Sequence, residues 1–166
     1  MHDESVSSDR PSFSIETHGC KLNTADSQQL AEELIESGYV LNKNESAPDI
    51  YILNSCTVTH VADRKARKSI SAARRKYPET LVVASGCYAQ RDPETVAALT
   101  GVDLVVTNRQ RHRFVELVTG RLSSSVTPCA NGANHPSGFQ LLGRTRASLK
   151  IQEGCNQVCA YCIVPT

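Results

Sequence analysis

Three cysteines near the end of the chain, Cys155, Cys159 and Cys162, have a spacing that suits an iron-sulfur cluster. The C-x3-C-x2-C arrangement supplies three thiolates from one short loop and offers no fourth. A cubane cluster has four irons that normally take one cysteine each, so this loop leaves one iron open to a ligand that is not protein. Gly154 gives the loop the freedom to bend as it leaves the preceding segment. The run therefore predicts a 4Fe-4S cluster with one open coordination position.

A second set of three cysteines, Cys20, Cys56 and Cys87, is spread along the chain but recurs in one local setting. In each case an apolar run ends, a Gly or Ser follows, and the cysteine precedes a helix-length segment. The separations suit one βαβ repeat each, which takes about 30 residues or more. Isolated cysteines are often buried core residues. Three in matching positions favour metal ligation, and nearby helix N-termini stabilise thiolates.

Short apolar runs alternate with helix-length segments through most of the chain. Strands are expected at residues 13–17, 49–54, 81–85 and 103–106, and helices at residues 25–37, 58–76, 93–99 and 110–119. This alternation predicts an α/β fold with an open parallel sheet and helices on both faces, because a parallel crossover needs a helix-length connection. Cys20, Cys56 and Cys87 should then emerge at the carboxyl edge of the sheet, where open α/β sheets bind ligands.

Changes in composition along the chain predict its domain organisation. We expect a disordered amino terminus at residues 1–11, a cluster-bearing domain at 12–121, a linker at 122–146 and the start of another domain at 147–166. The linker is rich in Ser, Thr, Pro, Asn and Gly, and the last segment begins with a strand that runs into the Cys155 loop. The chain stops at Thr166, so we expect that second domain to be truncated.

Composition narrows the class of protein. The 18 basic and 17 acidic side chains among 166 residues nearly cancel, so the whole chain has no general attraction for nucleic acid. No basic stretch followed by an apolar run opens the chain and no segment has the length of a membrane span, so we expect a cytosolic protein without a membrane partner. Seven cysteines in a reducing compartment indicate metal or redox chemistry rather than disulfides.

Zinc is the alternative metal. Structural zinc usually takes four protein ligands, commonly from close-spaced pairs, and neither cysteine set supplies two such pairs. Cys129 or His135 is available to complete a zinc site with the Cys155 loop.

The expected helix after Cys56 carries seven basic residues and no acidic residue among them: Arg64, Lys65, Arg67, Lys68, Arg74, Arg75 and Lys76. Such a stripe is suited to RNA phosphates, and it is equally typical of an ordinary solvated helix face. The chain has no tryptophan and few other aromatics, so no base-stacking platform is evident.

With both cysteine sets in view, the chain resembles the radical-SAM methylthiotransferases, which add a methylthio group to adenosine derivatives in tRNA or to a ribosomal protein. The resemblance spans residues 13–166. Its motifs are residues 17–23 with Asp26 and Ser27, residues 54–59 with residues 62–65, residues 86–90, and residues 150–165. Gly-Cys-Lys-Leu-Asn at 19–23 and Cys-Thr-Val-Thr at 56–59 most resemble the branch acting on threonylcarbamoyladenosine beside the tRNA anticodon.

The resemblance implies two 4Fe-4S clusters with different tasks. Cys155, Cys159 and Cys162 would hold the cluster whose open iron binds S-adenosylmethionine and cleaves it to a deoxyadenosyl radical. Cys20, Cys56 and Cys87 would hold an auxiliary cluster that carries the sulfur, and a second S-adenosylmethionine supplies the methyl group. The implied product is 2-methylthio-N6-threonylcarbamoyladenosine in tRNA. Isopentenyladenosine, a ribosomal protein, or a stand-alone iron-sulfur or zinc module without catalysis are the alternatives.

The sequence departs from the family pattern at His18 and Ser55, where other residues are more usual. The remainder of the radical-SAM barrel and the carboxyl-terminal RNA-binding domain do not occur before Thr166. We therefore expect that the chain alone is inactive and that tRNA contacts lie mainly in those further domains, with the helix from Arg64 to Lys76 as the candidate contact here. No catalytic residue and no electron donor follow from the sequence.

Overall fold

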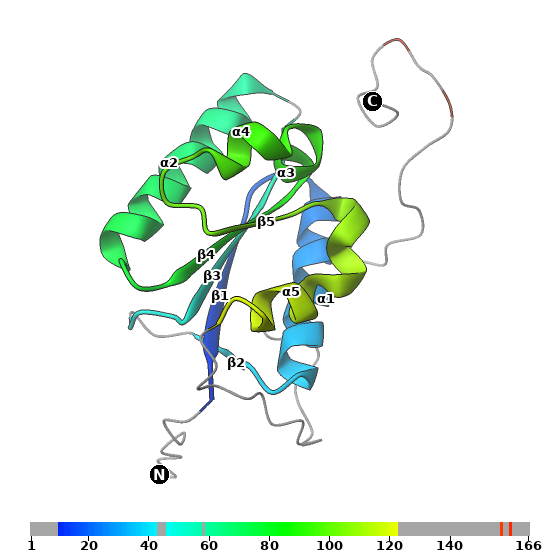
Figure 1. The fold of residues 1–166 in the computed structure, drawn as a ribbon. Helices are drawn as coiled ribbons and strands as arrows, with labels where there is room; N and C mark the ends of the chain where they lie inside the picture. Colours follow the sequence, from blue (N-terminus) through cyan, green and yellow to red (C-terminus); the bar gives the residue numbers. More distant parts are fainter. Residues whose placement is uncertain (1–9, 43–45, 58, 123–156, 158–159, 161–166) are drawn as a thin grey trace, which may run out of the picture.

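The computed structural model describes residues 10–42, 46–57, 59–122, 157 and 160. In this part of the chain, five parallel strands form one open sheet in the order β2-β1-β3-β4-β5 (Figure 1). Their bounds are β1 Ser12–Thr17, β2 Val40–Leu41, β3 Ile50–Ser55, β4 Leu81–Gly86 and β5 Leu104–Val106. β1, β3 and β4 are therefore direct neighbours, and helices connect β1 to β2, β3 to β4 and β4 to β5.

Helices cover both faces of the sheet. Their bounds are α1 Lys21–Glu36, α2 His60–Lys76, α3 Cys87–Arg91, α4 Pro93–Ala97 and α5 Phe114–Thr119, with a 3₁₀ helix, η1, at Asn108–Arg113. α1 and α5 pack against one face, and α2, α3 and α4 pack against the other (Figure 1). The prediction of an open parallel α/β sheet with helices on both faces is thus confirmed.

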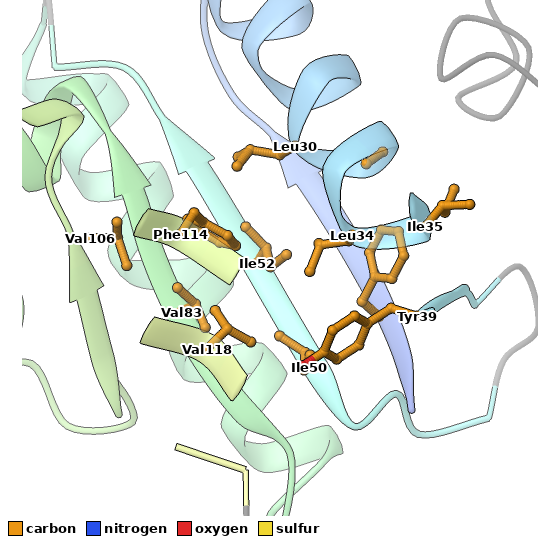
Figure 2. Packing of buried hydrophobic residues seen from close by; sticks show 12 residues of the cluster. Leu30, Leu34, Ile35, Tyr39, Ile50, Ile52, Val83, Val106, Phe114 and Val118 are labelled. Carbon is orange, nitrogen blue, oxygen red and sulfur yellow. The ribbon is translucent and has the colours of Figure 1, made fainter. Parts of the chain in front are cut away.

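The core is built by alternation along the central strands. Ile50 and Ile52 of β3 face the α1 and α5 layer, where Leu34 and Phe114 meet them (Figure 2). Tyr51, next to them in β3, belongs to the opposite cluster with α2. All six residues of β3 are buried, as expected for a strand covered on both faces. Packing on both faces thus fixes the central strands and, with them, the positions of the residues at the strand ends.

Several element limits differ from those expected. α1 begins at Lys21 rather than at residue 25, because the helix starts directly after Cys20 as its N-cap residue. The short strand β2 was not predicted, since two residues show no alternation. The segment after β4 forms two helices, because Asp92 ends α3 and its carboxylate accepts a hydrogen bond from the Thr95 N–H in α4. The last helical segment begins as η1, before residue 110.

Part of the predicted organisation lies outside the described residues. This applies to most of residues 1–11, to the linker at 122–146 except Leu122, to the strand at 147–152, and to Cys155, Cys159 and Cys162, as well as Cys129 and His135. Those domain limits stay predictions. None of the helices in the described ranges combines the length and apolar character needed to cross a bilayer.

Candidate metal centre

The sheet topology brings Cys20, Cys56 and Cys87 to one edge. Cys56 directly follows β3 and Cys87 directly follows β4, and the last residues of these strands, Ser55 and Gly86, are paired in register. Cys20 follows the neighbouring strand β1 and caps α1. Because β1, β3 and β4 are parallel, their carboxyl ends meet at the same side of the sheet. The shared edge expected from the sequence is therefore observed.

Cys20 and Cys56 lie at the switch point of the sheet, between β1 and β3, where successive connections turn to opposite sides. From β1 the chain passes through α1 to β2, whereas from β3 it passes through α2 to β4 on the other side of the sheet. The connections after β1 and β3 consequently diverge, and such a switch point is where open α/β sheets bind ligands. Cys20 and Cys56 follow these two strands.

Gly19 lets the loop that carries Cys20 lie directly against Cys56. Its φ of 132° is in the region that favours glycine, and a Cβ placed there would be 2.6 Å from the Cys56 Cβ and 2.7 Å from the Asn23 Oδ1. Any larger residue at this position would push the two cysteines apart.

Gly86 plays a similar part before Cys87. With φ at 91°, a Cβ there would lie 2.4 Å from both the Asn54 Oδ1 and the Ser55 carbonyl oxygen. The backbone of β4 therefore passes close to the end of β3 only because residue 86 has no side chain.

A buried polar network lies beneath the cysteines and ties β1, β3 and α1 together. The Asn54 Nδ2 donates to the Asn23 carbonyl oxygen and to the Ser27 Oγ, both at 2.9 Å. The Thr17 hydroxyl donates to the same Ser27 oxygen at 2.7 Å. Sequence pattern alone does not single out Asn23 or Asn54 as site residues, although each lies within a cysteine motif.

The three thiols differ in exposure and influence one another. Cys20 is exposed, Cys87 is half-buried and Cys56 is buried. Burial raises the pKa of the Cys87 thiol, the nearby Cys56 and Cys20 raise it further, and a hydrogen bond with Asn23 opposes the rise. Ligation by Cys87 must displace the proton that this environment retains, so metal binding at this thiol releases a proton.

The donor set fits a thiolate-bound metal group. Three thiols at one edge are soft ligands of the kind that take iron-sulfur clusters, zinc or copper(I). Within the described residues, no three Cys, His, Asp or Glu side chains are close enough to hold a single metal ion. The thiols therefore share an edge bordered by glycines without forming a closed single-ion cage.

His18, one of the two departures from the family pattern, belongs to a separate polar cluster. Its Nε2 lies 2.5 Å from the Glu16 carboxylate, which also accepts hydrogen bonds from the hydroxyls of Tyr51 and Ser69. Burial raises the pKa of Glu16, but these three hydrogen bonds lower it and prevail, so the pKa lies below its ordinary value. The cluster joins β1 to β3 and α2. An acidic residue inside a strand was the only sequence signal for it.

Ser55, the second departure, is occupied with the sheet itself. Its hydroxyl donates to the Ser85 carbonyl oxygen at 3.1 Å, which links the ends of β3 and β4.

A protein-family model matches residues 12–107, more than half of the chain, and is described as the uncharacterized protein family UPF0004. The chain belongs to the UPF0004 family. The match runs from β1 to just beyond β5 and contains Cys20, Cys56 and Cys87. The domain that carries the three thiols is thus the part of the chain that defines its family.

Curated relatives of this UPF0004 chain carry the names of tRNA methylthiotransferases. It is 36% identical to the threonylcarbamoyladenosine tRNA methylthiotransferase MtaB of Aquifex aeolicus over 91% of its length, and 35% identical to that of Bacillus subtilis over 90%. It is 34% identical over 91% to the tRNA-2-methylthio-N(6)-dimethylallyladenosine synthase of Paracoccus denitrificans. The matches cover 38%, 35% and 35% of those relatives. The resemblance to methylthiotransferases is confirmed, and the chain spans little more than a third of their length.

Replacing Gly86 by Ala should destabilise the fold and disturb the site. The positive φ costs about 1–3 kcal/mol for a residue with a side chain, and the new Cβ displaces Asn54 or the Ser55 backbone. Urea denaturation should show a free energy of unfolding that is lower by at least about 1 kcal/mol. Gly120→Ala, at an ordinary φ of −68°, should change it by less than about 0.5 kcal/mol. Equal stability of the two variants would contradict the close approach at Gly86.

Proposed function

We propose that this UPF0004 chain is the auxiliary-cluster part of a cytoplasmic radical-SAM tRNA methylthiotransferase, which forms 2-methylthio-N6-threonylcarbamoyladenosine beside the anticodon. The observation that carries the proposal is the meeting of Cys20, Cys56 and Cys87 at the carboxyl edge of β1, β3 and β4. Three thiols from three strand ends leave a cubane cluster with one iron that no cysteine of this set holds.

Each group at the edge has a task in this proposal. Cys20, Cys56 and Cys87 would hold the auxiliary 4Fe-4S cluster, which when bound supplies the sulfur of the methylthio group. Gly19 and Gly86 let the backbone approach the thiols closely. Cys155, Cys159 and Cys162, outside the described residues, would hold the second 4Fe-4S cluster together with S-adenosylmethionine. The protein thus orients the reactants and limits access of water, while the cofactors supply the reactivity.

The choice of adenosine derivative rests on motifs. The names of the relatives cite threonylcarbamoyladenosine in two cases and dimethylallyladenosine in the third, at nearly equal identity, so tRNA is common to all three. Residues 19–23 and 56–59 favour the threonylcarbamoyladenosine branch. Dimethylallyladenosine is the second candidate because of the Paracoccus relative.

The outer face of α2 is the part of this chain best suited to contact the tRNA backbone. Arg64, Lys65, Arg67, Lys68 and Arg75 are exposed, and none of them takes part in an ion pair within the described ranges. The acidic residue of the helix, Asp63, is buried and accepts from the Thr57 hydroxyl.

Three of these basic residues form a line. Arg64, Lys68 and Arg75 follow one side of the helix over about 16 Å, and Ser71 and Ala72 give the groove between the basic side chains a floor of small residues. Phosphate groups have space to approach the cations there. In contrast, Arg74 is engaged with Asp103 and three backbone carbonyls and belongs to the fold.

Replacing Cys20, Cys56 and Cys87 together by Ala should halve the iron that the chain binds. After anaerobic reconstitution with iron and sulfide, the unchanged chain should hold about eight irons and the variant about four, since only the second cysteine set remains. Iron analysis and sulfur-to-iron charge-transfer absorption measure this. Cys129→Ala should have no effect. A colourless, zinc-loaded chain would exclude the proposed clusters.

The complete reading frame that contains this chain should restore the methylthio group in a bacterial strain lacking its own methylthiotransferases for threonylcarbamoyladenosine and for isopentenyladenosine. Mass spectrometry of the nucleosides of purified tRNA should detect 2-methylthio-N6-threonylcarbamoyladenosine. With the triple cysteine variant, the tRNA should retain N6-threonylcarbamoyladenosine without a methylthio group. A methylthio group on isopentenyladenosine, which is the same nucleoside as dimethylallyladenosine, would select the second candidate. A tRNA without any methylthio group would contradict both candidates.

Replacing Arg64, Arg67 and Lys68 by Gln should weaken binding of tRNA to the chain and reduce its salt dependence. Loss of three phosphate contacts lowers the slope of log affinity against log salt by about two to three. Fluorescence anisotropy with labelled tRNA at several salt concentrations measures this slope. The matched variant Arg109→Gln, Arg113→Gln, Arg121→Gln removes the same charge elsewhere and should alter the slope little. Equal slopes for the two variants would assign α2 to solvent.

A further inference from the structure

The carboxamide of Asn23 occupies the centre of the cysteine edge. Asn23 lies in the first turn of α1 and is only 2% exposed, so both ends of its amide need partners inside the protein. The Cys20 thiol donates to its Oδ1, with the sulfur 3.3 Å away. A hydrogen bond between the Asn23 side chain and the Cys87 thiol also acts on the pKa of that thiol. One amide thus binds the Cys20 thiol and also lowers the pKa of the Cys87 thiol.

The same residue is bound to the strand that leads to the third cysteine. The Asn23 Nδ2 donates to the Ser55 carbonyl oxygen at 3.3 Å, immediately before Cys56. The Asn23 carbonyl oxygen accepts from the Asn54 Nδ2 at 2.9 Å. Asn23 therefore connects the loop after β1 with the end of β3.

Space around Asn23 is limited in a way that fits this connection. Its Oδ1 lies only 2.7 Å from where a Cβ of residue 19 would stand, so the missing side chain of Gly19 makes room for the amide. Longer side chains do not fit without moving Cys20 or Cys56, and shorter ones leave the Ser55 carbonyl oxygen without this donor. Leaving a buried polar group unpaired costs about 1–3 kcal/mol.

The chemistry of the position requires both ends of an amide. A carboxylate at residue 23 keeps an acceptor for the thiols but offers no donor to Ser55, and it adds a negative charge beside sulfurs that become thiolates on ligation. A leucine has a similar shape and neither donor nor acceptor. Asparagine alone among residues of this shape serves the thiols and the strand end together.

We infer that Asn23 is the positioning residue of the auxiliary site: its carboxamide ties Cys20 to the end of β3, beside Cys56 and Cys87, and so sets the separation of the three sulfurs before a metal group binds. This inference rests on the proposed function for the identity of the group that binds. The arrangement of the thiols themselves is a property of the metal-free chain. Removing a group that orients metal ligands typically lowers the metal affinity about 10- to 100-fold.

The test uses Asn23→Leu and Asn23→Asp in the 166-residue chain with Cys155, Cys159 and Cys162 replaced by Ala, so that only the auxiliary site remains. After reconstitution, both variants should hold less than half of the iron of the same chain with Asn23 intact. Ser27→Ala serves as the matched variant, because Ser27 is fully buried in the same network, but within the described residues no hydrogen bond joins it to a cysteine. It should load iron normally, and circular dichroism checks that all three variants are folded.

A metal-free measurement separates this inference from the proposed function. In glutathione redox buffers, the equilibrium constant for forming a Cys20–Cys87 disulfide, located by mass spectrometry, should be lower in Asn23→Leu, because the Cys20 thiol is no longer held in place. An unchanged equilibrium together with normal iron loading would overturn the positioning role. Failure of the parent chain to bind iron, with the disulfide equilibrium still dependent on Asn23, would refute the cluster and leave the positioning role intact.

Discussion

The parallel pairing of β1, β3 and β4 is the constraint on which the rest of the molecule depends. Hydrogen bonds in register place Thr17 beside Asn54 and Ser55 beside Gly86, so residues far apart in sequence end at the same edge. A shift by one residue would turn side chains to the opposite face. Burial on both faces, with complete burial of β3, opposes such a shift. The hydrophobic core thus determines the positions of the thiols indirectly.

The polar groups at the edge add a second level of order. The core fixes strands, but Cys20 lies in a loop, where strand pairing no longer acts. Gly19, Asn23 and Asn54 continue the connection through close contact and hydrogen bonds. The polar cluster around Glu16 joins β1 to α2 on the opposite face. The edge is held from both sides, which is the requirement for keeping several ligands at defined distances.

Much of this could be predicted from the sequence, and the remainder could not for physical reasons. Apolar runs followed by Gly-Cys or Ser-Cys indicate strand ends, so the parallel sheet and the shared edge were predictable. β2 has only two residues and depends on pairing with β1. The role of Asn23 depends on α1 beginning at Lys21, which became clear only from the structure. Metal ligation by Cys20, Cys56 and Cys87 stays a prediction.

The unequal exposure of the three thiols gives the edge an open side and a closed side. Cys20 is exposed, whereas Cys56 lies beneath the Gly19 loop. Oxidants and alkylating reagents reach accessible sulfur first. Oxidation of a chain without its metal group should therefore begin at Cys20, on the β1 side, and reach the buried Cys56 last.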